Sequence, residues 1–581
     1  MIFLSSMQTR GLKINYLRLI LLGIVFIFLQ LCLRCYAEDV LTSTNKVVLP
    51  PFFVEEKGPH WNYASAPGLE VLTRCDEDIT LGIVKQVYRA QSYVDTLLPK
   101  RYQVKKTLPR VLLLYPHEMK PGLPQGLLGK STDQDQSERD SFSSRDFRNE
   151  QNIENINKIE FFPNLDLRDP DVLITFFIAP SERSELAEAI VTPQAVQTSM
   201  LERLPALPWW FTLGFANMYR SLYAQNNKIG FKSMVFVNPT ETALIEKNSE
   251  HPRFLPPIKE LFSEHGFSPT KPDYEARRSA LFTEAELFIR WVYSDPTGKR
   301  RDQLFSFVDK TINDHASEST FFSCFGLNYT ELWERLCDYV PDAITRSIPI
   351  EYKDDVSIPN LTLRLATESE IGQIKGDWQR FEAEYVKKAY PAYSNRYLQE
   401  ARLSLQHAHD RGGDSATLFT IRGLLELHAG DSISARAYLE DASKANAIRP
   451  HAYYELTRLR YDDVLKHPEG TENKLSEKQV MFVLEPLLKS KTQEPRPIDA
   501  NLFLCRLIIQ SSTHLNPQLV EYIQEGIDLY PRNIPLLYLT AGVWALHSHT
   551  KEAKKLLLHA LSLEPDDNWK PKLVNLLSAI N

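Results

Sequence analysis

The chain has 581 residues, of which 43% are apolar and 24% are charged, a composition typical of globular proteins. This length is enough for roughly two to four domains, because about 150 residues is a usual domain size. A formal net charge of -7 argues against a nucleic-acid-binding protein, which usually carries a basic face. We therefore expect a multidomain globular protein without a nucleic-acid partner.

The N-terminus has the pattern of an export signal. Positively charged residues precede a nearly unbroken apolar run over 19–33, and small residues suited to signal cleavage follow before Glu38. The run is short for a membrane span, which needs about 20 apolar residues. The sequence predicts a signal peptide over 1–37 and a secreted, periplasmic or cell-envelope protein. A retained anchor is the alternative, and it would be the protein's contact with a membrane.

The next segments alternate between strand and helix. Residues 67–75 alternate like a half-buried strand, and Asp76 can cap a helix that runs to about Leu98. Residues 110–115 form a continuous apolar run, which predicts a central strand. Residues 118–157 are polar, with too little apolar surface to offset the entropy of ordering them. We expect a long mobile insert there, with a regulatory or partner-binding role as an alternative.

Two further strands are predicted at 159–167 and 172–178, joined by a tight turn. Three carboxylates, Asp166, Asp169 and Asp171, gather at this turn. They could form a cation site, but the ordinary preference of Asp for turns explains them more simply.

The stretch 205–219 reads Pro-Ala-Leu-Pro-Trp-Trp-Phe-Thr-Leu-Gly-Phe-Ala-Asn-Met-Tyr. It resembles the helix of gluzincin-type zinc peptidases that carries the third metal ligand, Pro-x-Trp-Phe-x-Glu-Gly-Leu-Ala-x-Tyr. The framework of that motif is retained at Pro208, Trp210, Phe211, Gly214, Ala216 and Tyr219. Leu213 stands at the position of the zinc-binding Glu, and a leucine side chain has no lone pair to give a metal.

The other ligands of such a zinc site are missing as well. These peptidases place His-Glu-x-x-His on the preceding helix, here expected over 192–202. The sequence contains no such motif, and no histidine lies between His117 and His251. The resemblance extends over roughly 67–345, with further similar stretches at 281–292 and 325–332. It implies a peptidase-like α+β domain over 38–350 without metal, cofactor or catalytic residues of the peptidase type.

Two features of this region leave alternatives open. An aromatic set could line a substrate cleft, although helical spacing of aromatic residues more often marks a core. Its members are Trp209, Trp210, Phe211, Phe215, Tyr219 and Tyr223. Cys324 and Cys337 could form a disulfide in an oxidising compartment, or could be two buried thiols.

A linker is expected at 351–381, and the chain then repeats. Ala401, Leu405 and Ala408 recur as Ala435, Leu439 and Ala442, the 34-residue period of tetratricopeptide (TPR) repeats. Repeats are predicted to start at 382, 416, 450, 500 and 534, with an insertion near 467–473. A final apolar helix at 573–580 would cap the array. The histidine pairs 407/409 and 547/549 lack carboxylate or cysteine partners in the sequence, so solvated helix faces are favoured over metal sites.

Stacked helix pairs predict a solenoid, because one pair cannot bury both of its apolar faces. The concave face of such an array usually binds a protein or peptide. The candidate partner-binding residues are Thr420, Leu424, Tyr454, Arg458 and Tyr538. The alternative is a repeat array that only packs on the first domain.

The sequence therefore predicts an α+β N-terminal peptidase-like domain followed by an all-α TPR solenoid over 382–581. The favoured function is a non-catalytic, exported interaction or scaffold protein. The alternative is a hydrolase that uses a metal-free cleft, since a scaffold does not dictate its chemistry. Its candidate groups are Glu182, Glu185, Glu188, Glu202 and Tyr219.

Overall fold

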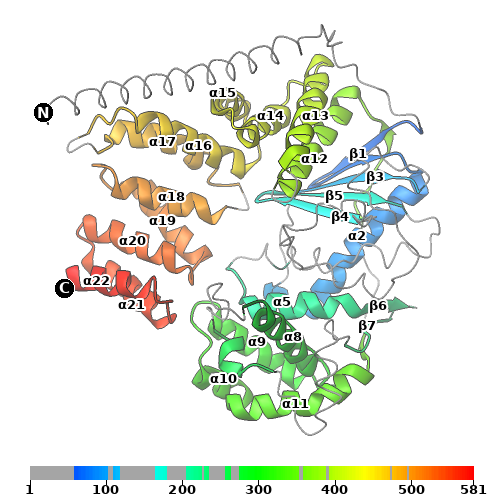
Figure 1. Cartoon of the computed structure of the whole chain (residues 1–581), viewed down its shortest axis with the longest axis vertical. Helices are drawn as coiled ribbons and strands as arrows, with labels where there is room; N and C mark the ends of the chain where they lie inside the picture. Colours follow the sequence, from blue (N-terminus) through cyan, green and yellow to red (C-terminus); the bar gives the residue numbers. More distant parts are fainter. Residues whose placement is uncertain are drawn as a thin grey trace, which may run out of the picture. The chain divides into compact units, whose positions relative to one another are not determined.

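The computed structural model describes residues 58–102, 109–117, 164–179, 200, 205–225, 228–234, 255–263, 274–351, 358–387, 391–470, 474–493 and 496–580. A mixed α/β region with a six-stranded sheet is followed by a series of paired helices (Figure 1). The expected export signal at 1–37 and the polar insert at 118–157 lie outside the described residues.

The six-stranded sheet has the strand order β4-β5-β3-β2-β1-β9. Its strands are β1 (Asn62–Ala66), β2 (Leu69–Thr73), β3 (Arg110–Tyr115), β4 (Asn164–Asp169), β5 (Val172–Ile178) and β9 (Arg364–Leu365). β2, β3 and β5 are parallel, whereas β4 and β1 pair with them in the antiparallel sense. The strands predicted at 110–115 and 172–178 are confirmed with these bounds.

Among the described residues, one helix covers each face of this sheet, which explains why β3 and β5 are apolar throughout. α2 (Glu77–Leu97) packs through Ile83 and Val84 on one face. On the other face lies α12 (Glu368–Val386), where Trp378 stacks on Phe176 with a centroid distance of 5.3 Å. We expected a linker at 351–381, but this range contains β9 and most of α12, which belong to the sheet and its cover. The repeat start predicted at 382 likewise lies inside α12.

A helical subdomain follows the sheet in the chain. Its helices are α5 (Trp209–Met218), α7 (Ile258–Leu261), α8 (Tyr274–Tyr293), α9 (Lys299–Thr311), α10 (Glu318–Phe325) and α11 (Tyr329–Thr345). A three-stranded antiparallel sheet of β6 (Leu222–Gln225), β7 (Lys228–Phe231) and β8 (Ile348–Glu351) borders them. The two ends of α2 pack in different cores. Its first half packs on the six-stranded sheet, whereas its last turn packs in the core of the helical subdomain. There the hydroxyl group of Tyr293 on α8 donates a hydrogen bond to Leu97 O at 2.6 Å.

Free thiols, not a disulfide, are found in this subdomain. Cys324 and Cys337 are both free cysteines, and Cys337 is buried while Cys324 is partly buried. Burial raises the pKa of the Cys337 thiol to about 12, so it stays protonated at neutral pH.

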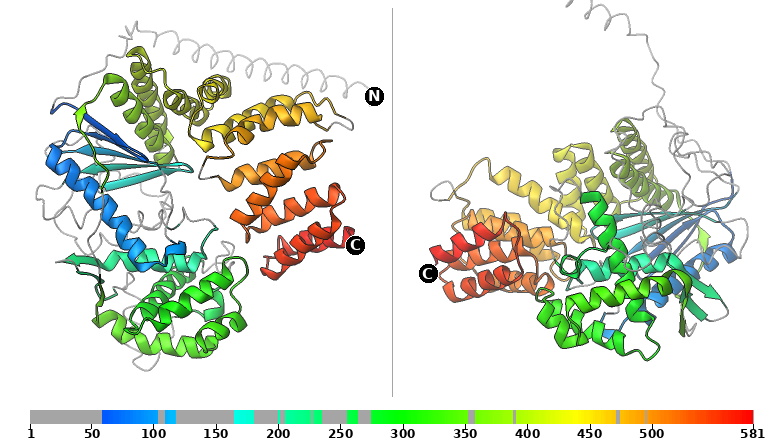
Figure 2. Two further views of the ribbon diagram at one scale, coloured as in Figure 1. Left: turned by 180° about the vertical axis from the view of Figure 1, so that it is seen from behind. Right: turned by 60° about the horizontal axis from the view of Figure 1, so that its bottom comes forward.

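The remaining helices are paired, and the pairs lie side by side in chain order (Figures 1 and 2). They are α12 with α13 (Pro391–Asp410), α14 (Ala416–Ala429) with α15 (Ser432–Lys444), α16 (Pro450–Val464) with α17 (Glu477–Lys489), α18 (Ile498–Ile509) with α19 (Pro517–Leu529), and α20 (Ile534–Leu546) with α21 (Thr550–Ser562). α22 (Lys570–Ala579) follows the last pair.

Local sequence signals account for the helix starts in this array. The starts predicted at 416, 450 and 534 are confirmed, and the one predicted at 500 lies at 498. Ser415 and Asn533 are N-caps whose side chains accept backbone hydrogen bonds, and Pro450 occupies the first helical turn. A Cβ at Gly423 would lie 2.6 Å from Leu439 Cγ, so only glycine lets α14 and α15 approach this closely.

Candidate functional site

The helix that resembles a peptidase zinc helix is held by close packing. A Cβ added at Gly214 of α5 would lie 2.4 Å from the carbonyl oxygen of Ala285 on α8, so the glycine is required by the contact between the two helices. Trp210, Phe211 and Phe215 are buried in the same core. These aromatic residues therefore form core packing, and the retained framework of the motif has a structural explanation.

Leu213, at the position of the zinc ligand, is partly exposed. Among the described residues, the one group of three His, Cys, Asp or Glu side chains close enough to hold a metal is Asp169, Asp171 and His451. None of these three residues belongs to α5, so no such group is found beside Leu213 in this part of the chain.

The candidate residues for an enzymatic alternative are placed only in part. Tyr219 is 1% exposed and packs against Phe215 and Phe231, so it lies in the core and not in a cleft. Glu182, Glu185, Glu188 and Glu202 lie outside the described residues. So does the helix expected over 192–202, except for Met200, which is buried. The described residues therefore add no support for a metal-free hydrolase.

A buried carboxyl group that the sequence interpretation missed lies on α8. Glu284 is fully buried, and neither of its carboxyl oxygens has a hydrogen-bond partner among the described residues. Burial, and then the nearby Glu260, raise the pKa of Glu284 well above its ordinary value. The protonated, uncharged form of this side chain is therefore favoured, and a protonated carboxyl group is a poor metal ligand. Its spacing from Leu281 and Phe288 on the apolar stripe of α8 was the signal that could have revealed it.

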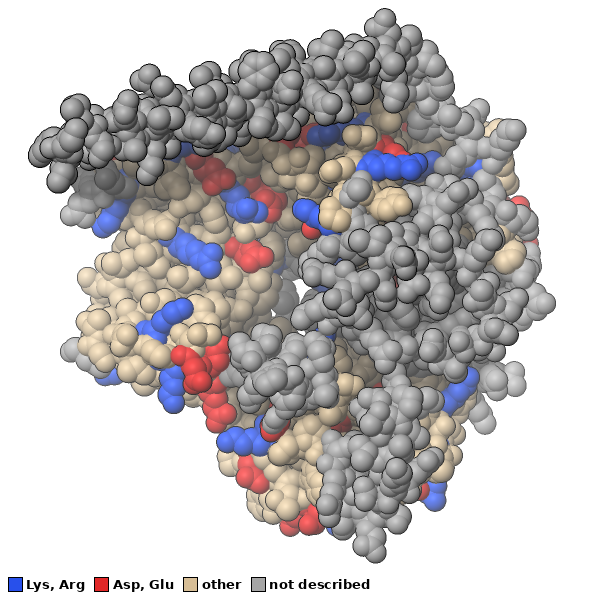
Figure 3. Space-filling view, in the orientation of Figure 1, with Lys and Arg blue, Asp and Glu red and all other residues tan. Residues whose placement is uncertain are grey.

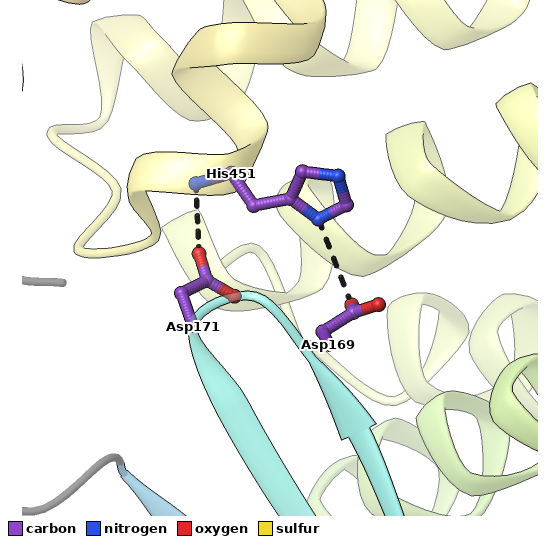
Figure 4. A group of neighbouring side chains, drawn as sticks. All are labelled: Asp169, Asp171 and His451. Atoms are coloured by element: carbon purple, nitrogen blue, oxygen red, sulfur yellow. Dashed lines mark hydrogen bonds and ion pairs between the residues drawn. The ribbon is translucent and has the colours of Figure 1, made fainter. Parts of the chain in front are cut away.

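The predicted turn between β4 and β5 carries a second group of buried charges (Figure 4). Asp171 accepts a hydrogen bond from Arg449 Nε at 2.8 Å through one oxygen. Its other oxygen accepts from the backbone N–H of His451 at 2.8 Å, at the start of α16. The turn thus contacts a helix that lies some 280 positions later in the sequence.

Asp169, at the end of β4, lies among three cationic side chains. Arg380 Nη2 of α12 is 2.6 Å and Arg449 Nη2 is 3.0 Å from Asp169 Oδ2, and His451 Nδ1 is 3.8 Å away. Asp377 of α12 completes the arrangement by accepting from Arg380 Nε at 2.8 Å. We call these six residues the charged cluster: Asp169, Asp171, Asp377, Arg380, Arg449 and His451.

Burial and opposite charges act against one another in the charged cluster. Burial alone would raise the pKa of Asp169, but Arg380, then His451 and Arg449, hold it well below its ordinary value. Burial alone would lower the pKa of His451, but the nearby carboxylates of Asp169 and Glu455 raise it to about 9. Both groups are therefore charged at neutral pH, and they balance one another.

The charged cluster does not fit a metal ion. Asp169 and Asp171 already accept hydrogen bonds from the guanidinium groups of Arg380 and Arg449. A divalent cation placed between the carboxylates would face both guanidinium charges at short range. The predicted preference for turn chemistry over a cation site is thus consistent with this geometry, although the turn makes ion pairs that no local pattern indicated.

The candidate partner-binding residues divide into two sets. Thr420 and Leu424 are 0% and 1% exposed, because α14 is contacted by α12, α13, α15 and α16. Tyr454 is half-buried against Phe503, and Arg458 is exposed and paired with Glu455 at 2.9 Å. Only the second set is accessible to a partner.

The accessible set continues over the following helix pairs. Tyr538 of α20 is half-buried, with its ring 5.7 Å from that of Trp569. Since α16 begins at 450 and α18 at 498, Leu502 and Arg506 occupy the positions of Tyr454 and Arg458 in the next pair. The repeat start was predicted at 500, two positions too late. The expected register was therefore shifted, and these two residues were not predicted as equivalents of Tyr454 and Arg458.

A groove of about 440 Å³ lies between α15 and α16. Ile433 in this groove is 84% exposed. The charged side chains around it pair with one another, since Asp463 contacts Arg436 and lies 3.1 Å from Lys466. The groove therefore offers an apolar side chain but little unpaired charge to a ligand.

No protein-family model matches the sequence, and no curated protein matches it either. Among the described residues, no helix is both long enough and apolar enough to cross a membrane. On the face drawn in Figure 3, basic and acidic side chains of the described residues are interspersed. The described part of that face therefore shows no single-sign basic surface of the kind typical of nucleic-acid binding.

Proposed function

We propose that this chain is an exported, non-catalytic interaction or scaffold protein. In this proposal a peptidase-like domain without zinc ligands is joined to TPR-like repeats, and the repeats bind a protein or peptide. The observation that carries the proposal is the row of accessible side chains at equivalent positions of successive helix pairs: Tyr454 and Arg458 on α16, Arg506 on α18 and Tyr538 on α20.

The chemistry of this row suits a peptide partner. Tyrosine and arginine contribute most often to binding hot spots, because they combine apolar area with directional polar groups. The rings of Tyr454 and Phe503 are in edge contact at 6.3 Å, and Arg458 lies over Tyr454 at 5.9 Å. These contacts hold the side chains in place before a partner arrives, which lowers the entropy lost on binding.

The binding proposal can be tested by site-specific photo-crosslinking of the full chain. A photoreactive phenylalanine analogue would replace Tyr454 or Tyr538, and cross-linked partners would be identified by mass spectrometry. The same analogue at Phe322, which is 56% exposed on α10, serves as the control. The proposal expects one shared product from the two repeat positions that Phe322 does not give and that Arg458→Ala with Arg506→Ala abolishes. Identical products from all three positions would contradict it.

The absence of peptidase-type zinc chemistry has its own test. Elemental analysis of the purified protein should find much less than one zinc per chain, because Leu213 replaces the third ligand and the sequence lacks His-Glu-x-x-His. About one zinc per chain, lost on substitution within 190–215, would refute this part of the proposal.

A further inference from the structure

The charged cluster lies on the same helix face as the accessible partner-binding residues. His451, Tyr454 and Arg458 follow one another on α16 at spacings of three and four residues, which places them on one side of the helix. The β4–β5 turn contacts the first of these residues through Asp169 and Asp171. The turn therefore occupies the amino-terminal end of this face, and Tyr454 and Arg458 continue it.

The contact has the features of a ligand bound at a site. Asp171 accepts a backbone N–H in the first turn of α16, where the helix dipole favours a negative charge. Its second oxygen receives the charge-assisted hydrogen bond from Arg449. Arg449 is itself the N-cap residue of α16, so the site is built from the start of one helix.

The strand directions place this contact at one defined edge of the six-stranded sheet. The β4–β5 turn immediately precedes β5, so it lies at the amino ends of the parallel strands β2, β3 and β5. Ligand sites of open parallel sheets form at the carboxyl ends of the strands. The charged cluster is thus a contact between the sheet and the helical repeats, and not part of a cleft at the opposite edge.

We propose that the Asp169-Pro170-Asp171 turn is an internal ligand of the helical repeats. It locks the six-stranded sheet onto α12 and α16 and closes the amino-terminal end of the helix face that carries Tyr454 and Arg458. An external partner then reaches this face only from Tyr454 onward. The lock stands on the described contacts alone, and only its consequence for a partner rests on the proposed function.

Because the charges are buried, removing a single partner from the lock should be costly. Side chains of Arg380, Arg449 and Asp171 are 0%, 8% and 1% exposed, so removing one partner leaves a buried charge uncompensated. Neutralising both carboxylates of the turn removes the ligand charge, and leaves Arg380 and Arg449 with Asp377 alone among the carboxylates of the cluster. The turn should then separate from α16 without unfolding the distant helix pairs.

The test compares the full chain with its Asp169→Asn/Asp171→Asn variant by amide hydrogen exchange and mass spectrometry. Exchange should be at least tenfold faster in β4, β5 and the first two turns of α16, and unchanged in α20–α22. Asp166→Asn is the matched control, because Asp166 lies on the same strand outside the charged cluster and accepts from Thr175. It should leave exchange in α16 unchanged. Equal exchange of wild type and variant in α16, or uniform acceleration over the whole chain, would overturn the lock.

A milder variant and a chemical probe guard against loss of folding. Asp171→Asn alone retains the Asp169 ion pairs, and should give a smaller acceleration in the same segments. Labelling with phenylglyoxal, a reagent for accessible guanidinium groups, should modify Arg449 at least tenfold faster in the double variant than in wild type. Unchanged labelling of Arg449 in both variants would also overturn the proposal. Neither readout involves a partner, so failure here is distinct from failure of the photo-crosslinking test.

Discussion

Two buried carboxyl groups in different regions of this molecule have pKa values that are shifted in opposite directions. Glu284 in the helical subdomain and Asp169 in the charged cluster are both removed from water, which by itself raises the pKa of each. Glu284 has no counter-charge among the described residues, and its pKa stays well above the ordinary value. Asp169 lies beside Arg380, Arg449 and His451, and its pKa falls well below.

The comparison teaches which of the two regions depends on charge. In the helical subdomain, Gly214 and Glu284 lie in a core built mainly by close packing of apolar side chains. In the charged cluster, the carboxylates and guanidinium groups are buried together and each depends on the other. The following variants separate these two kinds of stabilisation.

The largest effect is expected from Arg449→Met. This change leaves Asp171 without its guanidinium partner and weakens the pairing of Asp169, so the free energy of unfolding should fall by about 3–5 kcal/mol. Chemical denaturation of the full chain would measure the loss. Arg396→Met is the control, because the Arg396–Glu400 pair is exposed, and it should cost less than about 1 kcal/mol. Similar losses for both variants would show that burial of the pair is unimportant.

A loss of about 3 kcal/mol is expected from Gly214→Ala. The new methyl group would overlap the Ala285 carbonyl and force α5 away from α8. Gly542→Ala on α20 is the matched control, since its Cβ would meet only Ile509 Cδ1 at 3.4 Å. That substitution should stabilise the protein by about 0.5–1 kcal/mol through helix propensity. Thermal unfolding of both variants tests the opposite signs, and a tolerated Gly214→Ala would refute the packing explanation.

The pH dependence of the free energy of unfolding should reveal the contribution of charged His451. Its folded pKa, about 9, is raised above its ordinary value of 6.5, so its contribution is complete below about pH 6.5 and is lost as pH rises through 9. Between pH 7 and pH 9 this group should account for a loss of about 2 kcal/mol. The stability difference between wild type and His451→Gln should shrink by that amount over this range. Parallel stability curves for the two proteins would contradict the charged state of His451.

A gain in stability, smaller than the three preceding losses, is expected from Glu284→Met. Replacing an unpaired buried carboxyl with an apolar side chain of similar length should stabilise the protein by about 1–2 kcal/mol at neutral pH. Because the folded pKa of Glu284 is raised, the wild type loses stability as pH rises above about 4.5, and the advantage of the variant should grow with pH. Glu284→Gln, which keeps a polar group, should gain less. Destabilisation by Glu284→Met in urea titrations would indicate a partner for the carboxyl group.

Elements with a strong local pattern could be predicted with accurate bounds. The apolar runs at 110–115 and 172–178 are strands, and the 34-residue spacing of the alanines predicted the helix starts at 416, 450 and 534. The strand β1, the helix α10 and the small sheet of β6, β7 and β8 were not expected. They are short, and β8 pairs with a strand more than 110 positions earlier in the chain.

The accessible part of the candidate site could be predicted only in part, for a similar reason. Repeat position placed Tyr454, Arg458 and Tyr538 on the surface, but the same rule placed Thr420 and Leu424 there too. Both are buried, because α14 is surrounded by four other helices. A repeat pattern predicts which side of a helix faces away from the other helix of its pair. It does not predict whether another part of the chain covers that side.

The sequence by itself determined the leucine at 213 and the lack of a His-Glu-x-x-His motif, the apolar strands and the period of the helix pairs, since each depends on residue type and near-neighbour spacing. Only the tertiary structure decided that Asp169 and Asp171 meet Arg380, Arg449 and His451, residues that lie more than 200 positions away. Opposite charges at such separations leave no local pattern, because any of the chain's many carboxylates can pair with any arginine until the fold brings two of them together and excludes water.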